Sequence, residues 1–133
     1  MYYIGIDVGV HTGVAVWDST KREFTSLLTI PIHQAMRFVA EFKEEKKVYV
    51  EDARQRKWYG ANAQAKQQGA GSVKRDSKIW EDFLFDIGAE FVMVAPGKGL
   101  TKWDRESFKK FTGYKGQTSE HSRDAAMLVY GRC

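Results

Sequence analysis

The first 30 residues contain three apolar, β-forming runs that are separated only by short turns. The runs are YYIGID at residues 2–7, HTGVAVWD at 11–18 and REFTSLLTI at 22–30. Turns this short join antiparallel strands, because a parallel pair needs a crossover of roughly a dozen residues or more. The sequence therefore predicts that the chain begins with three antiparallel strands of one sheet.

A helix and a second kind of strand are predicted next. Apolar residues recur at helical spacing from Ile32 to Phe42, and the short apolar run VYVED at 48–52 predicts a buried strand. A strand that follows a crossover helix usually lies parallel to its neighbour, which we expect to be the strand at 2–7. The mixed sheet that results is typical of an α/β protein.

The remaining patterns complete one α/β domain over residues 1–133. Ser72 and Ser119 are suited to cap helix N-termini, and Gly88 is suited to end a helix. The sequence thus predicts a five-stranded mixed sheet flanked by helices. We expect the later helices at 61–68, 72–87, 103–113 and 120–131, and the fifth strand at 90–96.

Composition limits the kinds of protein that the chain can be. Hydrophobic residues make up 43% of the 133 residues, which excludes a disordered chain and allows one domain with a core. The one cysteine, Cys133, cannot form an intrachain disulfide, which fits a reducing compartment. Since Asp7 interrupts the first apolar run and no stretch of about 20 apolar residues exists, we expect neither a signal peptide nor a membrane span. The expected location is the cytoplasm.

Basic residues gather in two blocks that also contain aromatic residues. Residues 52–78 carry seven basic and two acidic side chains, and residues 98–116 carry six and two. This mixture suits a phosphate backbone whose bases stack on aromatic rings, although a solvated charged surface gives the same pattern. The predicted DNA-binding residues are Arg54, Arg56, Lys57, Trp58, Tyr59, Lys74, Arg75, Lys98, Lys102 and Lys115.

Three acidic residues stand out by their positions in the predicted elements. Asp7 ends the first strand and Glu51 lies at the end of the fourth, and the ends of neighbouring strands are about 4.8 Å apart. Asp124 is on the last helix, with His121 three residues earlier on the same face. A buried carboxylate without a partner is costly, and an oxygen-rich ligand set suits Mg²⁺ or Mn²⁺ better than a structural zinc ion. We therefore expect the three carboxylates to meet at a divalent cation.

These motifs resemble those of the RuvC-type Holliday junction resolvases, members of the ribonuclease H-like nuclease superfamily. The matching segments are IGIDVGVHTGVAVWD, VYVED, VMVAPGKGLTK, EHSRDAAMLVYG and, more weakly, AKQQGAGSVK, and together they cover most of the chain. The resemblance implies a ribonuclease H-like fold with two Mg²⁺ ions per active site, for which Mn²⁺ substitutes. The ligands it implies are Asp7, Glu51, His121 and Asp124. Many members have an acid at the position of His121, so this residue is either a ligand or a proton shuttle.

The same resemblance implies a crossover junction endodeoxyribonuclease that acts in DNA recombination and repair. It would resolve four-way junctions by paired symmetric nicks that leave 5′-phosphate and 3′-hydroxyl ends. Two active sites imply a homodimer, with the helix at 61–70, and in addition 72–87, at its interface. The chain is shorter than typical cellular members, which favours a viral or phage member. The expected site of action is then the nucleoid or the DNA compartment of a host cell.

Two pairs of residues also take roles from the resemblance. Lys98 and Lys102 match a region where the family carries basic residues close to the scissile phosphate. They either act as catalytic residues that offset developing charge or make ordinary backbone contacts. Trp58 or Tyr59 would be the aromatic residue at the junction centre, in a loop, ARQRKW, that is longer and more basic than the family leads us to expect.

Three other functions share parts of this pattern. Sugar kinases and actin-like ATPases open with a similar Ile-Gly-Ile-Asp-x-Gly motif, but they need two such lobes and 133 residues supply one. A different ribonuclease H-like nuclease, acting on flaps, other branched DNA or RNA–DNA hybrids, is a second alternative. A non-catalytic module that binds DNA junctions is the third, although a pure binder has no use for clustered carboxylates.

Overall fold

Five strands form one mixed sheet in the part of the chain that the computed structural model describes, residues 1–55, 71–96 and 103–133. β1 pairs antiparallel with β2 and parallel with β4, β3 pairs antiparallel with β2, and β5 pairs parallel with β4. The order is therefore β3-β2-β1-β4-β5. The predicted antiparallel start and the parallel pairing of the fourth strand with the first are confirmed. The strands are β1 (Tyr2–Asp7), β2 (His11–Asp18), β3 (Glu23–Pro31), β4 (Lys46–Glu51) and β5 (Phe91–Val94).

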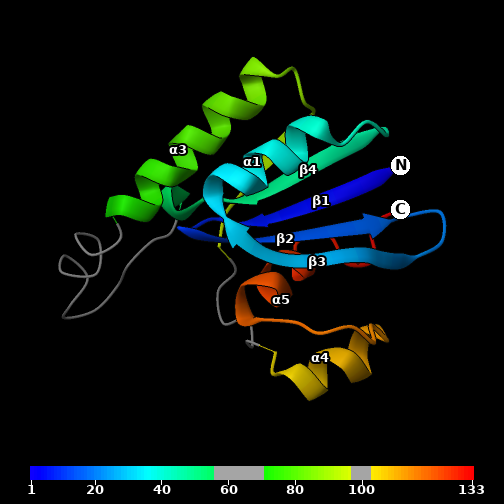
Figure 1. The fold of residues 1–133 in the computed structure, drawn as a ribbon. Coiled ribbons are helices and arrows are strands. Elements are labelled where there is room, and N and C mark those ends of the chain that lie inside the picture. Colours follow the sequence, from blue (N-terminus) through cyan, green and yellow to red (C-terminus); the bar gives the residue numbers. More distant parts are fainter. Residues whose placement is uncertain (56–70, 97–102) are drawn as a thin grey trace.

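Helices cover both faces of this sheet (Figure 1). α1 and α3 lie on one face, whereas α5 lies on the other face with α4 beyond it. The α/β class and the mixed sheet flanked by helices are thus confirmed. None of the helices in the described ranges combines the length and apolar character that crossing a bilayer requires. The helices are α1 (Ile32–Glu41), α3 (Gly71–Asp86), α4 (Arg105–Thr112) and α5 (Glu120–Met127), and a short 3₁₀ turn, η1 (Ala53–Gln55), follows β4.

The sheet separates two apolar layers, which explains why its strands are apolar on both faces. On one side, Ile4, Ile6, Val14, Val16, Val48 and Val50 pack against Ala35 and Val39 of α1 and Trp80 and Leu84 of α3. On the other side, Ala15, Trp17 and Tyr49 pack with Phe108 of α4 and with Ala125, Ala126 and Val129 in and after α5. Side chains alternate between the two layers with the period of two that strands impose.

Some predicted boundaries differ from the structure. The fourth strand begins at Lys46, because β1 extends its pairing to the two lysines that precede the apolar run. The last helix ends at Met127 instead of 131, where the N–H groups of Leu128 and Val129 turn back to carbonyls three residues earlier. The prediction that Ser72 caps a helix was wrong, because Gly71 is already helical and Ser72 lies inside α3. The predicted helix at 61–68 lies outside the described residues.

Other helix ends lie close to their predicted positions, although α4 begins at Arg105, two residues after the predicted start at 103. Gly88, just after α3, has a φ of +70°, and its N–H donates to the carbonyl of Phe85 at 3.1 Å. Asp104 caps α4 by accepting a hydrogen bond from the N–H of Ser107 at 2.7 Å, and Gly113 ends that helix with a φ of +76°. These ends follow the preference for Asp or Ser at N-caps and for glycine in the left-handed region after a helix.

Candidate active site

The register of the sheet directs two predicted ligands toward α5. Ile6 and Val50 are register partners in β1 and β4, and both face α1 and α3. Asp7 and Glu51 follow them directly, and successive side chains of a strand point to opposite faces. Both carboxylates therefore point to the face that α5 covers, at the ends of two adjacent parallel strands.

Two glycines let α5 lie close enough to the sheet to complete the site. A Cβ atom on Gly5 would overlap the carbonyl oxygen of Ala125, and one on Gly13 would overlap that of His121, both well inside the 3.0 Å that real Cβ contacts keep. Gly13 is also the register partner of Asp7. The helix backbone at His121 thus packs against the strand beside Asp7. The sequence did not lead us to predict this role, although Gly5 and Gly13 lie in adjacent strands on the same face as Asp7.

The start of α5 is fixed to the sheet on its other side. Ser119 accepts a hydrogen bond from the N–H of Ser122, whose hydroxyl in turn accepts from the N–H of Ser119, so the predicted cap at Ser119 is confirmed as a capping box. The hydroxyl of Ser119 also contacts the hydroxyl of Thr29 in β3. Two residues later comes His121, whose position along the sheet is therefore set by the helix cap.

His121 and Asp7 are in direct contact. The imidazole Nδ1 lies 2.9 Å from Oδ2 of Asp7. The Asp7 side chain is 14% exposed, whereas that of His121 is 50% exposed. The pair therefore has a buried carboxylate and an imidazole that reaches water.

The pKa of Asp7 depends on burial and on the charges around it, including those of the other two carboxylates. Burial raises the pKa of Asp7 from its ordinary 3.8 to about 6. The hydrogen bond from His121 opposes this rise, while the negative charges of Asp124 and Glu51 add to it. Asp7 therefore contacts His121 directly and lies within electrostatic reach of Glu51 and Asp124.

The donor chemistry of this cluster suits a divalent cation. Within the described residues, no three His, Cys, Asp or Glu side chains are grouped closely enough to hold a metal ion as they stand. Oxygen donors are what Mg²⁺ and Mn²⁺ prefer, however, and a cation would relieve the repulsion that adds to the effect of burial on the pKa of Asp7. The residues fit the expected ion by their chemistry, with Asp7, Glu51, Asp124 and His121 as the groups that would hold it.

The predicted DNA-binding residues fall in different places. Lys74 and Arg75 are in the first turns of α3, where Arg75 is 69% exposed and lies 3.6 Å from Asp76. Lys115 is exposed in the segment that precedes α5. The other candidates, apart from Arg54, lie outside the described residues: Arg56, Lys57, Trp58, Tyr59, Lys98 and Lys102.

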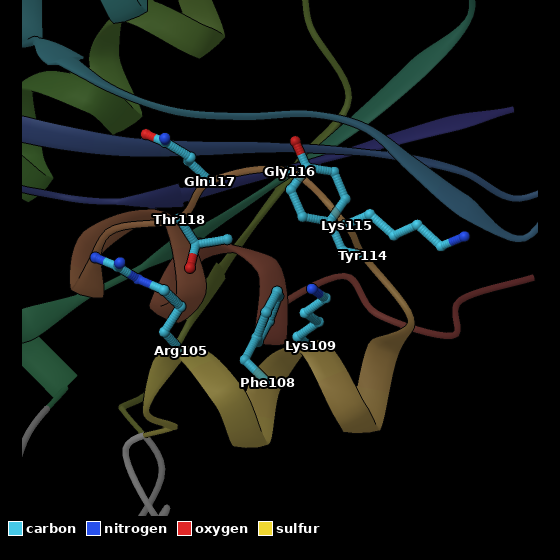
Figure 2. A pocket seen from close by; sticks show the side chains of 8 residues that line it. All are labelled: Arg105, Phe108, Lys109, Tyr114, Lys115, Gly116, Gln117 and Thr118. Atoms are coloured by element: carbon cyan, nitrogen blue, oxygen red, sulfur yellow. The ribbon is translucent and has the colours of Figure 1, made fainter.

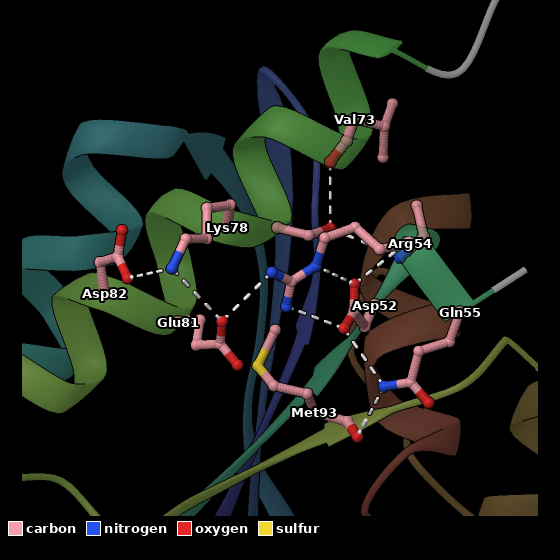
Figure 3. A network of polar contacts seen from close by, with 10 residues as sticks. Asp52, Arg54, Gln55, Val73, Lys78, Glu81, Asp82 and Met93 are labelled. Atoms are coloured by element: carbon pink, nitrogen blue, oxygen red, sulfur yellow. Dashed lines mark hydrogen bonds and ion pairs between the residues drawn. The ribbon is translucent and has the colours of Figure 1, made fainter. Parts of the chain in front are cut away.

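Arg54 is engaged inside the protein. Its guanidinium donates to both carboxylate oxygens of Asp52, at 2.8 and 2.9 Å, and to Glu81 of α3 at 3.1 Å (Figure 3). Gln55 also donates to Asp52, at 3.2 Å, and to the carbonyl of Met93 at 3.2 Å. These contacts join the end of β4 to α3 and to β5. They count against a DNA-binding role for Arg54, because three of its five N–H donors are already used within the protein.

Asp52 is the acceptor at the centre of this network. Burial alone would raise its pKa, but the hydrogen bonds from the side chain of Arg54, from Gln55 and from the Arg54 N–H outweigh burial and hold the pKa below its ordinary value. Asp52 also donates its own N–H to the carbonyl of Val94 at 2.7 Å. The network therefore holds the backbone beside Glu51, and our sequence reasoning assigned no role to Asp52.

The site as a whole offers an acidic centre and a half-exposed imidazole at one edge of a sheet. The carboxylates can hold cations, and the imidazole can make hydrogen bonds. Comparison with models of known protein families and with curated proteins finds no match for this chain.

Proposed function

We propose that this chain is a metal-dependent, structure-selective DNA endonuclease with a ribonuclease H-like fold, similar to the RuvC-type resolvases. The observation that carries the proposal is the environment of Asp7, which is largely buried, hydrogen-bonded to His121 and within electrostatic reach of Glu51 and Asp124. Such an arrangement is costly without a cation, because like charges out of water repel each other. A protein that only binds DNA gains nothing from that cost.

Each residue of the cluster has a role in this proposal. Asp7, Glu51 and Asp124 supply the oxygens that hold two divalent cations. When bound, the cations would supply the Lewis acidity needed to activate a water for in-line attack and to stabilise the leaving 3′ oxygen. His121 is held through Nδ1 by Asp7, which leaves Nε2 as the atom that exchanges a proton with water or the leaving group.

The proposed substrate is a four-way DNA junction, cut by paired nicks that leave 5′-phosphate and 3′-hydroxyl ends. A homodimer would supply the two active sites. The protein would act in DNA recombination and repair, in the compartment that holds the DNA of its cell or host. The support for this substrate is the sequence resemblance and the two basic blocks, whose cations suit a phosphate backbone. Lys98 and Lys102 keep their proposed place near the scissile phosphate. Another ribonuclease H-like nuclease remains the alternative, and it differs in substrate, not in the residues of the site.

The test is a cleavage assay with four substrates: a four-way junction, a flap, a duplex and an RNA–DNA hybrid, each with Mg²⁺ and then with Mn²⁺. We expect paired symmetric nicks in the junction. Asp7→Asn and Asp124→Asn should abolish cleavage and preserve junction binding, because each removes a cation ligand but no basic residue. Asp86→Asn is the matched control, since Asp86 is an exposed aspartate in α3, on the other face of the sheet.

The outcomes separate the candidates. Normal junction cleavage by Asp7→Asn would show that the cluster is not the catalytic centre. Cleavage of the hybrid alone would select a ribonuclease H-type activity in place of the resolvase. Junction binding by the unchanged protein without cleavage of any substrate would select the non-catalytic module.

A further inference from the structure

A second, basic site lies on the same side of the sheet as α5. A pocket of about 180 Å³ opens between α4 and the segment that leads into α5 (Figure 2). Arg105 and Lys109 rise from α4 on either side of Phe108, and the ring of Tyr114 stands over them. Lys115 and Thr118 also line the pocket, and only two residues separate Thr118 from His121.

The charge of this pocket has one sign. Of the residues that line it, Arg105, Lys109 and Lys115 are cationic, and none is acidic. Arg105 and Lys109 are four residues apart on one helix, a spacing that places two side chains about 5–6 Å apart on the same face. Among the described residues, no carboxylate lies within ion-pair distance of these three cations. The mutual repulsion of the cations would be relieved by an anion between them.

The walls of the pocket are held in place by buried contacts. Phe108 is only 1% exposed and anchors α4 in the apolar layer beneath the sheet. Arg123 of α5 donates to the hydroxyl of Thr118 at 2.9 Å and to the carbonyl of Trp103 at 2.8 Å, which ties both walls to α5. The ring of Tyr114 packs edge-on against Phe24. A site whose frame is fixed before binding loses little entropy when a ligand enters.

We propose that this pocket binds a phosphate group of the DNA backbone outside the scissile position. A phosphodiester fits within the volume and matches the charge, and guanidinium and ammonium donors are the groups that bind phosphate oxygens in proteins. The proposal rests on the proposed function, because it takes DNA as the source of the phosphate. It adds Arg105 and Lys109 to the residues that hold the substrate, and it places the contact next to the helix that carries His121 and Asp124.

The experiment measures junction binding as a function of salt. Asp7→Asn is the background, so that the DNA stays intact, and Arg105→Gln/Lys109→Gln is added to it. Loss of one phosphate contact lowers the slope of log affinity against log salt concentration by about 1 and weakens binding roughly equally for different sequences. The matched control is Arg37→Gln/Lys110→Gln, which makes the same charge change at exposed positions that do not line the pocket: Arg37 on α1, and Lys110 on α4 itself.

A smaller slope for the pocket variant, with the control close to the background, would support the proposal. Equal slopes and affinities for the two double variants would overturn it, even if the unchanged protein cuts junctions. A pocket-dependent slope in a protein that cuts no DNA would keep this site and refute the nuclease. Inorganic phosphate is the second probe: if it shifts the amide resonances of residues 105–118 and junction DNA does not displace it, DNA is not the source of the phosphate.

Discussion

Asp7 and Asp52 lie at the ends of neighbouring parallel strands, and their environments are opposite. Both side chains are largely buried, 14% exposed for Asp7 and 4% for Asp52. Burial raises the pKa of Asp7 to about 6, and the charges of Asp124 and Glu51 add to the rise. For Asp52 burial acts in the same direction, but the hydrogen bonds from Arg54 and Gln55 outweigh it.

The difference separates a structural carboxylate from a candidate catalytic one. Asp52 receives a cation from its own chain, so its charge is already compensated and it serves the contact between β4 and α3. Among the described residues, no Lys or Arg pairs with Asp7, whose neighbours are an exposed imidazole and two further carboxylates. The negative charge of Asp7 is therefore not paired with a cationic side chain of the described residues, and a bound metal ion would stabilise it. Buried charges that the fold does not compensate are typical of functional sites.

Removing the guanidinium of Arg54, which pairs with Asp52, should have the largest effect on stability. Arg54→Ala would leave Asp52 buried without its main donor, and we expect the free energy of unfolding to fall by about 3 kcal/mol. Urea denaturation measures this loss. Lys78→Ala is the control: Lys78 contacts the same Glu81 from the exposed surface of α3, and its removal should change stability little. Equal losses in the two variants would mean that Asp52 does not depend on Arg54.

A second change acts on the Asp7 side alone. Gly13→Ala would push the backbone of His121 away from the sheet, and such overpacking costs about 2 kcal/mol. The protein should remain folded, but its cleavage rate should fall strongly, since His121 and Asp124 would move together away from Asp7. Gly71→Ala is the matched control, because a Cβ atom there has no neighbour within 4 Å. Retention of full activity by a folded Gly13→Ala protein would contradict the assigned role of α5.

The raised pKa of Asp7 predicts that removing its charge increases stability, whereas the two substitutions above decrease it. Its pKa in the folded protein lies above the ordinary value, so ionising it favours the unfolded chain, and stability falls as pH rises from about 4 to about 6. The shift corresponds to at most about 3 kcal/mol. We expect Asp7→Asn to be more stable than the unchanged protein by about 1.5 kcal/mol at pH 8 without divalent ions. This gain is smaller than the full shift because the substitution also loses the hydrogen bond to His121.

Thermal or urea unfolding of both proteins between pH 4 and pH 8 measures this difference. The gap between the two should widen with pH and level off above about 7, once Asp7 has ionised in the folded protein. Asp52→Asn should instead lose stability at neutral pH. An Asp7→Asn protein that is less stable than the unchanged one at pH 8 would show that the charge of Asp7 is already compensated.

Divalent cations should produce the smallest effect. Mg²⁺ at about ten times its dissociation constant stabilises the state that binds it by about 1.4 kcal/mol. We expect this gain in the unchanged protein and not in Asp7→Asn, measured as a shift of the thermal midpoint at pH 8. An equal shift in both would place the Mg²⁺ site elsewhere.

Most of the sheet could be predicted because two independent signals agree: the residue pattern of each strand and the lengths of the connections between strands. The turns between the first three strands leave no room for crossovers, and the helix from Ile32 returns the chain parallel to β1. The order of strands places Asp7 and Glu51 at one edge of the sheet, but the approach of His121 and Asp124 also depends on how α5 packs against Gly5 and Gly13. What the sequence did not predict depends on distance in space. Nothing in the basic run after Glu51 distinguishes Arg54, whose donors point inward, from a cation that faces DNA.

The central claim is that Asp7, Glu51, His121 and Asp124 form one site for divalent cations. Electron paramagnetic resonance of added Mn²⁺, which counts bound ions without any DNA, tests it most directly. We expect Mn²⁺ to bind to the unchanged protein and to Asp86→Asn, and we expect that binding to be lost in Asp7→Asn and in Asp124→Asn. Unchanged Mn²⁺ binding in Asp7→Asn would contradict it.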